Sequence, residues 1–273
     1  MANQDFIGTT DNDFTTSANW TSAVPLAGDN VTFTQSNANS LDGVDKGSVN
    51  LASLGVGPNY AGTIASAGSY LIISADSVTL ANGTSCGEVY LDSGSTDEID
   101  FITIKSQSVN YIYLKGDYGT ILVRSGNVKL VSGTCDNLRI EWNGVGTPPV
   151  VINEGMALGA WSTASSVTAS QTGGSFTTFK ADRGTFAISG GTTGTYDIHG
   201  TANVVHTAAS IPSVVEVWPG GTFDASQDVS QKTWPSVILH QGGTADFDTG
   251  FNNHTITSKN ELGDTFVNMF QAA

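Results

Sequence analysis

Two copies of one short phrase near the C-terminus constrain the fold more than any other feature of the sequence. Residues 215–222 (Val-Glu-Val-Trp-Pro-Gly-Gly-Thr) are followed by residues 237–244 (Val-Ile-Leu-His-Gln-Gly-Gly-Thr). A looser pair of phrases, residues 88–92 and 111–115, has nearly the same spacing. Each phrase contains the alternating apolar residues of a short strand. A period in the low twenties built from short strands and turns predicts the coils of a β-solenoid.

The rest of the chain is typical of an all-β protein. Segments with alternating apolar and polar residues recur at short intervals, and the body shows no helical spacing of apolar residues. The 32 glycines indicate many turns between short strands. Asn82-Gly83 and Asn143-Gly144 are typical of antiparallel hairpins, so a β-sandwich or jelly-roll remains an alternative. The repeated phrases favour an all-β, single-stranded parallel β-helix (β-solenoid) with capped ends.

We expect three parts along the chain. Residues 1–46 form an N-terminal cap or arm, residues 47–260 the β-helix body, and residues 261–273 a C-terminal tail. The body would hold roughly ten coils of about 22–25 residues each. Three apolar residues of the tail have helical spacing and predict a short helix, which packs on the last coil or reaches a neighbouring subunit: Phe266, Met269 and Phe270.

The chain is acidic and poor in charged residues. Its net charge is −15 and only 13% of its residues are charged, which argues against binding of nucleic acid or of an anionic membrane. The first residues lack the basic region and apolar run of a secretory signal, so we expect synthesis in the cytoplasm without export. Cys86 and Cys135 are separated in the sequence by two coils and are therefore expected to be free thiols.

The segment 19–33 carries a resemblance to a known class of proteins. It contains Asn19-Trp20, then Pro25, then Gly28-Asp29, and then Val31 and Phe33 separated by one residue. This order resembles the N-terminal start of many bacterial and bacteriophage β-helix proteins, including autotransporter-type passengers. The resemblance implies a β-helix in which Trp20 covers the open core and Val31 and Phe33 begin the first coil. The composition also looks like that of bacteriophage virion proteins, a class that includes head decoration (cement) proteins and tailspikes.

The acidic residues after the repeated glycines are the main candidates for chemistry. The spacing of the two phrases places Asp224 beside Asp246, and Asp248 follows shortly after. Stacked carboxylates of this kind bind Ca²⁺, act as an acid pair in polysaccharide cleavage, or simply form turns. Only Lys232 and Lys259 lie nearby as bases. Since no paired histidines or nucleophile elbow occur either, we assign no catalytic residue and no cofactor and expect that the protein is not an enzyme.

Outward-facing aromatic residues are the main candidates for contact with a partner. If Val89 and Leu91 face the core, Tyr90 faces outward, and Tyr111 and Tyr113 do so on the following coil. The spacing of the looser repeat would then stack Tyr90 against Tyr113. Trp218 is expected to be exposed in the same way. Such rings suit a subunit interface, carbohydrate binding or burial under a loop.

Together these features predict a structural protein of a bacteriophage virion. The first hypothesis is a capsid decoration or cement protein, acting as a homotrimer on the major capsid protein or on another virion protein. The second is a carbohydrate-binding or depolymerising β-helix of the tailspike type. A surface adhesin is a third reading, for which the sequence shows no export route.

Overall fold

The computed structural model describes residues 2–36, 39–94, 99–144, 148–228, 230–247, 254–262 and 267–268. The fold is an all-β parallel β-solenoid of about 11 turns, with 1% of the chain helical. The predicted fold class is therefore confirmed, and the β-sandwich alternative is wrong because neighbouring strands run parallel. By its internal contacts the chain divides into unit 1 (residues 1–136 and 143–150) and unit 2 (residues 137–142 and 151–273).

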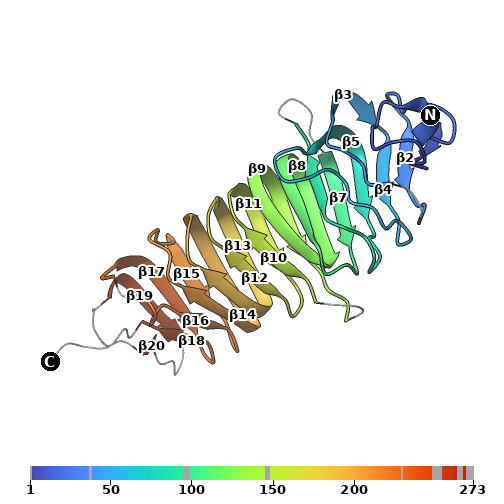
Figure 1. The fold of residues 1–273 in the computed structure, drawn as a ribbon. Coiled ribbons are helices and arrows are strands. Elements are labelled where there is room, and N and C mark those ends of the chain that lie inside the picture. Colours follow the sequence, from blue (N-terminus) through green and yellow to red (C-terminus); the bar gives the residue numbers. More distant parts are fainter. Residues whose placement is uncertain are drawn as a thin grey trace. The chain divides into compact units, whose positions relative to one another are not determined.

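In each unit, successive turns add parallel strands to the stack (Figure 1). The described part of unit 1 contains a short 3₁₀ helix, η1 (Ser17–Asn19). Its strands are β1 (Asn3–Asp5), β2 (Asn30–Phe33), β3 (Asp45–Leu51), β4 (Ser53–Val56), β5 (Leu71–Leu80), β6 (Val89–Asp92), β7 (Ile99–Lys105) and β8 (Tyr111–Ser125). Two strands contribute residues to both units: β9 (Asn127–Ile140) and β10 (Val150–Asn153).

Further strands belong to unit 2. They are β11 (Met156–Thr163), β12 (Thr168–Gln171), β13 (Ser175–Ile188), β14 (Thr192–His206), β15 (Val214–Val217), β16 (Thr222–Asp224), β17 (Thr233–His240), β18 (Thr244–Asp246), β19 (Thr255–Leu262) and β20 (Val267–Asn268). Val267–Asn268 runs parallel to β18, so this part of the tail is a strand where the sequence predicts a helix. Pairing with β18 satisfies backbone groups that an isolated short helix would leave to water. Phe266, Met269 and Phe270 lie outside the described residues.

The two registers predicted from the repeats are confirmed. Val215 pairs with Val237, and Val89 pairs with Ile112. The expected coil length is wrong for part of unit 2, where turns are shorter: Ser175 on β13 pairs with Thr192 on β14. Long strands such as β13 and β14 leave fewer residues for loops, which explains both the shorter turns and their larger number.

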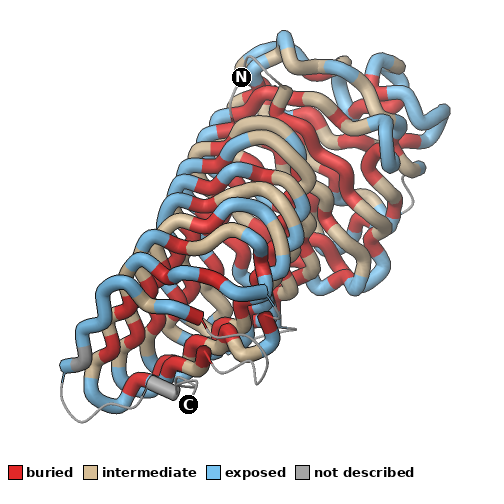
Figure 2. Tube along the Cα trace, turned by 90° about the vertical axis from the view of Figure 1, so that its left-hand side faces the viewer, coloured by how far each residue is buried: buried red, intermediate tan, exposed pale blue. Residues whose placement is uncertain are grey.

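Alternation along the strands builds the core of each unit. In unit 1, Leu54, Val78, Ile102 and Ile121 occupy one register position on four successive turns, and all four are buried. Figure 2 shows the same alternation of buried and exposed positions along the strands. Burying a whole column of aliphatic side chains supplies the hydrophobic stabilisation that an isolated turn lacks.

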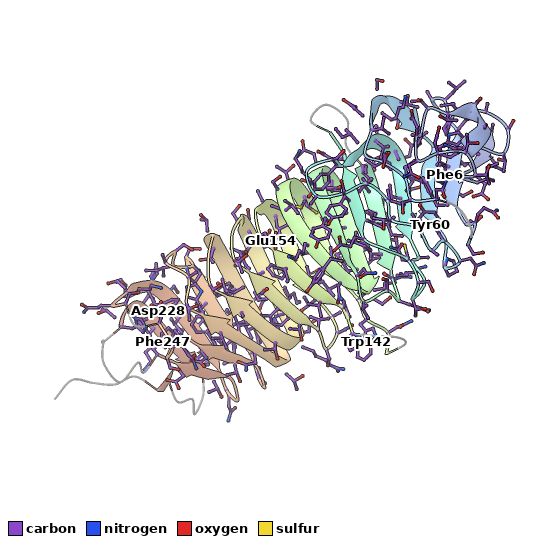
Figure 3. All side chains as sticks on the ribbon, in the orientation of Figure 1. Phe6, Tyr60, Trp142, Glu154, Asp228 and Phe247 are labelled. Atoms are coloured by element: carbon purple, nitrogen blue, oxygen red, sulfur yellow. The ribbon has the colours of Figure 1, made fainter. Side chains whose placement is uncertain are left out.

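The first residues of the chain belong to this stack. β1 pairs in parallel with β2, and β2 with β4, so residues predicted as a cap already form turns of unit 1. The ring of Trp20 lies 4.7 Å from that of Phe14 and 5.2 Å from that of Phe6. Phe6 in turn begins a column of aromatic rings that continues through Phe33 to Tyr60. Figure 3 labels the two ends of this column, Phe6 and Tyr60. All five rings are buried, and Trp20 thus has the packing that the resemblance implies.

Candidate functional site

Four tyrosines form a ladder on the outer wall of unit 1. Tyr90 and Tyr113 are register partners, and their rings stack with centroids 4.3 Å apart and planes 4° apart, as predicted. Tyr70 meets Tyr90 edge-on at 5.5 Å, and Tyr111 lies 6.1 Å from Tyr113. We call Tyr70, Tyr90, Tyr111 and Tyr113 the tyrosine ladder.

The faces of these rings are already covered. Tyr90 is buried, with 6% of its surface exposed, and the groups that cover it include the neighbouring rings of Tyr70 and Tyr113. The ammonium group of Lys129 lies 5.1 Å from the ring centre of Tyr111 and 5.5 Å from that of Tyr113. Tyr111 and Tyr113 are half-buried. The ladder therefore ties neighbouring turns together and leaves little ring face for a ligand.

Glu88 fixes the polar ends of the ladder. Its carboxylate accepts hydrogen bonds from the hydroxyls of Tyr90, at 2.6 Å, and Tyr113, at 3.2 Å. Burial and this neighbouring carboxylate raise the pKa of both tyrosine hydroxyls, so they remain hydrogen-bond donors at neutral pH. The interface role predicted for these tyrosines stays a prediction.

A groove of about 820 Å³ lies next to the ladder on unit 1. Four charged side chains line it, and they come from β3, β6 and β8: Asp45, Asp92, Lys115 and Asp117. Asp92 and Lys115 directly follow the ladder on their strands, since each stands two residues after a ladder tyrosine and faces the same side. The remaining lining is small and polar except for Ile72, with Ser48 and Ser132 among it.

Glycines on successive turns line part of the groove. Gly116 and Gly133 both have positive φ, at 98° and 107°, which favours glycine. A Cβ added to Gly133 would collide with the backbone of Gly116, and one added to Gly116 would lie 2.7 Å from a carboxylate oxygen of Asp92. The turns thus approach more closely here than any side chain permits.

The charged groups of the groove are held in place by defined contacts. Lys115 forms an ion pair with Asp92 at 2.9 Å, and the hydrogen bond and charge of Asp92 raise the pKa of Lys115. Asp92 also accepts from the backbone N–H of Gly94 at 2.9 Å. Asp117 accepts from the hydroxyl of Thr134 at 2.8 Å, and Asp45 from the N–H of Gly47 at 3.0 Å. Because these contacts set their rotamers, the carboxylates present fixed acceptors to the groove.

Sequence reasoning missed this groove. The spacing of the looser repeat places Asp92 beside Lys115, and that pairing of opposite charges was the one available signal. Asp45 comes from a turn whose register is irregular, with a shift between Lys46 and Asn50, so its position does not follow from the period.

A second aromatic stack lies on the outer wall of unit 2. Trp218 is half-buried between two imidazoles, with ring centroids 5.1 Å from His199 and 3.6 Å from His240. The predicted exposure of Trp218 is therefore only partly met, since both ring faces are covered. His199 contacts Asp197 at 2.5 Å, and His240 contacts Glu216 at 2.8 Å.

The aspartates after the repeated glycines are arranged as predicted, and their bonds are those of a turn. Asp224 pairs in register with Asp246. One oxygen of Asp224 accepts from the backbone N–H of Ser226 at 2.8 Å and from its hydroxyl at 2.6 Å. This is the side-chain-to-backbone bonding that aspartate commonly makes in turns. Asp248 lies outside the described residues, so the Ca²⁺ site stays a prediction.

Lys232, one of the two lysines near these aspartates in the sequence, is buried in unit 2 and bound to a partner. It donates to the carboxylate of Asp228, labelled in Figure 3, and to the carbonyl of Ala208. Burial alone would raise the pKa of Asp228, but hydrogen bonds from Lys232 and Ser230 lower it. Lys232 is therefore a structural residue of the core and cannot serve Asp224 as a base.

His206 is a further buried polar residue that the sequence did not reveal. Its Nε2 lies 3.0 Å from the carbonyl of Ser210, which can only accept, so Nδ1 accepts from the hydroxyl of Tyr196 at 2.9 Å. Burial and the nearby ammonium of Lys232 lower the pKa of His206 to about 4. His206 is thus neutral at physiological pH and fully enclosed.

Other classes of site have no support in the described part of the chain. Cys86 and Cys135 are both buried, and no disulfide joins them. No group of three or more metal-ligating side chains is found among the described residues, and no described helix has the length and apolarity needed to cross a bilayer. Comparison with protein-family models, with curated proteins and with solved structures finds no match to this chain.

Proposed function

We propose that this chain is a non-catalytic structural protein of a bacteriophage virion, acting as a decoration or cement protein on the capsid. One observation supports the structural part of this proposal most strongly: outward-facing side chains of the strand walls bond to neighbouring turns. The tyrosine ladder and the Trp218 stack both join successive turns in this way. Asp224 forms its turn, and Lys232 neutralises Asp228.

Walls whose side chains bind neighbouring turns together suit a structural protein that bears mechanical load better than they suit an enzyme. Reactive sites need groups with perturbed pKa values that face a cleft. Tyr118, Tyr196 and His206 are perturbed but buried. Lys115 lines the groove, but its ion pair with Asp92 raises its pKa and so keeps it a protonated ammonium group. The virion assignment rests on the resemblance at residues 19–33 and on the hydroxyl-rich, acidic composition. A homotrimer on the major capsid protein is the arrangement we propose, since closed symmetry is the usual way to repeat one lateral contact.

The virion assignment predicts that the chain copurifies with particles. Mass spectrometry of gradient-purified virions should find it in a fixed ratio to the major capsid protein, and light scattering of the isolated protein should give three times the monomer mass. The matched control is an abundant cytoplasmic host protein, which should be lost during purification. Absence of the chain from particles whose capsid protein is readily detected would contradict the proposal.

A further inference from the structure

The groove of unit 1 extends across several turns. One register row passes from Asp45 through Ile72 and Asp92 to Lys115. Neighbouring strands lie about 4.8 Å apart, so this row covers roughly 14 Å, and β9 adds one more strand spacing. Ser132 of β9 lines the far end. The dimensions fit an extended chain of small units lying across the strands.

The charge of the lining restricts the ligand. Three carboxylates (Asp45, Asp92 and Asp117) face one ammonium group, that of Lys115. In a chain with a net charge of −15, such a groove repels polyanions, including nucleic acids and sulfated or sialylated glycans. Carboxylates held by neighbouring N–H and hydroxyl groups are instead good acceptors for neutral hydroxyl groups.

Strand pairing disfavours a peptide as the occupant. Extended peptides bind sheets mainly by adding a strand to an open edge. In the middle of this groove β5 is bonded to β3 and β6, and β6 to β5 and β8, so neither strand offers a free edge. A carbohydrate chain needs no backbone edge, because hydroxyl groups bond to side chains.

From these observations we propose that the groove binds a linear, uncharged oligosaccharide. Asp45 and Asp117 accept sugar hydroxyls, and Lys115, positioned by Asp92, donates to ring or hydroxyl oxygens. The glycines of the floor let sugar rings approach the backbone. Since the tyrosine ladder leaves little open ring face, binding depends mainly on hydrogen bonds and not on stacking. This inference stands independently of the virion assignment.

The protein is first screened on a glycan array of neutral linear hexose oligomers, from trisaccharides to hexasaccharides. The oligomer that binds best on the array then serves as the probe in calorimetric titrations, which measure its affinity for each variant. Ser48→Trp places a bulky ring in the groove from an exposed position and should weaken binding more than tenfold. Ala27→Trp adds the same ring at an exposed turn outside the lining and should leave affinity unchanged. Asp117→Asn keeps an acceptor for Thr134, removes the charge and should weaken binding severalfold.

The outcomes separate this site from others. Binding that survives Ser48→Trp, or that is lost only in the Asp224→Ala/Asp246→Ala double variant, would overturn the proposal. So would binding of anionic glycans or extended peptides in place of neutral oligomers, or binding of none of them. Thermal melts of each variant check that the fold is retained. Particle copurification is measured separately, so either proposal can fail alone.

Discussion

Replacing Gly133 with alanine is expected to lower the free energy of unfolding of unit 1 by roughly 3 kcal/mol or to prevent folding. Gly133 has a φ of 107°, and its missing Cβ would lie within 2.6 Å of the carbonyl carbon of Gly116 on the neighbouring turn. The three nearest atoms all belong to the backbone of Gly116, so no flexible side chain can move aside. The two turns would have to separate, which breaks the strand register beside the groove. Urea unfolding followed by circular dichroism measures the effect.

Gly68→Ala is the matched control. Gly68 also has positive φ, at 82°, but a Cβ there would meet nothing within 4 Å. The substitution should therefore cost only the backbone preference, about 1 kcal/mol. Insoluble Gly133→Ala protein beside soluble Gly68→Ala protein would support the account as well. Equal costs for both variants would show that the turns are not packed as closely as described.

Acid should destabilise unit 2 through His206. The pKa of this residue is about 4 in the folded protein and about 6.5 when unfolded, so the unfolded state binds more protons between these values. The stabilisation is therefore complete above pH 6.5 and is lost as the pH falls toward 4. Its loss amounts to roughly 3 kcal/mol at pH 4. The lowered pKa of Asp228 acts below its ordinary value of 3.8, outside this window.

The variant His206→Phe isolates the contribution of this residue. Phenylalanine fills similar space but cannot be protonated, so the variant should be less stable at pH 7, having lost the bonds to Tyr196 and Ser210. Its unfolding free energy should nevertheless fall less steeply between pH 6.5 and 4. Chemical denaturation at several pH values gives both slopes. Parallel slopes for the two proteins would contradict a buried, neutral His206.

The repeats allowed the fold class and part of the register to be predicted. A period in the low twenties, read with the alternation of each strand, places Val215 beside Val237 and Tyr90 beside Tyr113. The shorter turns around Ser175 were missed, although Gly173-Gly174-Ser175 is echoed 17 residues later by Gly190-Gly191-Thr192, the spacing at which Ser175 pairs with Thr192. Where the strands are long, glycines at the corners take the place of loops, so each turn contains fewer residues and the sequence period becomes shorter.

The contents of the candidate sites were harder to predict than their register. Alternation and spacing indicate that Tyr90 faces outward and stacks on Tyr113, but not that Tyr70 packs against it as well. The groove depends on an irregular register at Asp45 and on closely packed glycines, neither of which has a signature in a single sequence. A lysine such as Lys232 is normally exposed, and the sequence does not indicate that it is buried in an ion pair with Asp228, four residues earlier.

The ladder, the groove and the buried core all depend on the parallel register of neighbouring turns, and cysteine cross-linking tests it most directly. Thr185 and Asn203 are exposed register partners on β13 and β14, whereas Val205 stands two residues further along β14. Their Cα atoms should lie about 4.8 Å apart for the first pair and about 8 Å for Thr185 and Val205. Under mild oxidation we expect Thr185→Cys/Asn203→Cys to form a disulfide and Thr185→Cys/Val205→Cys to remain reduced. Cross-linking of the second pair in place of the first would contradict the register on which the account rests.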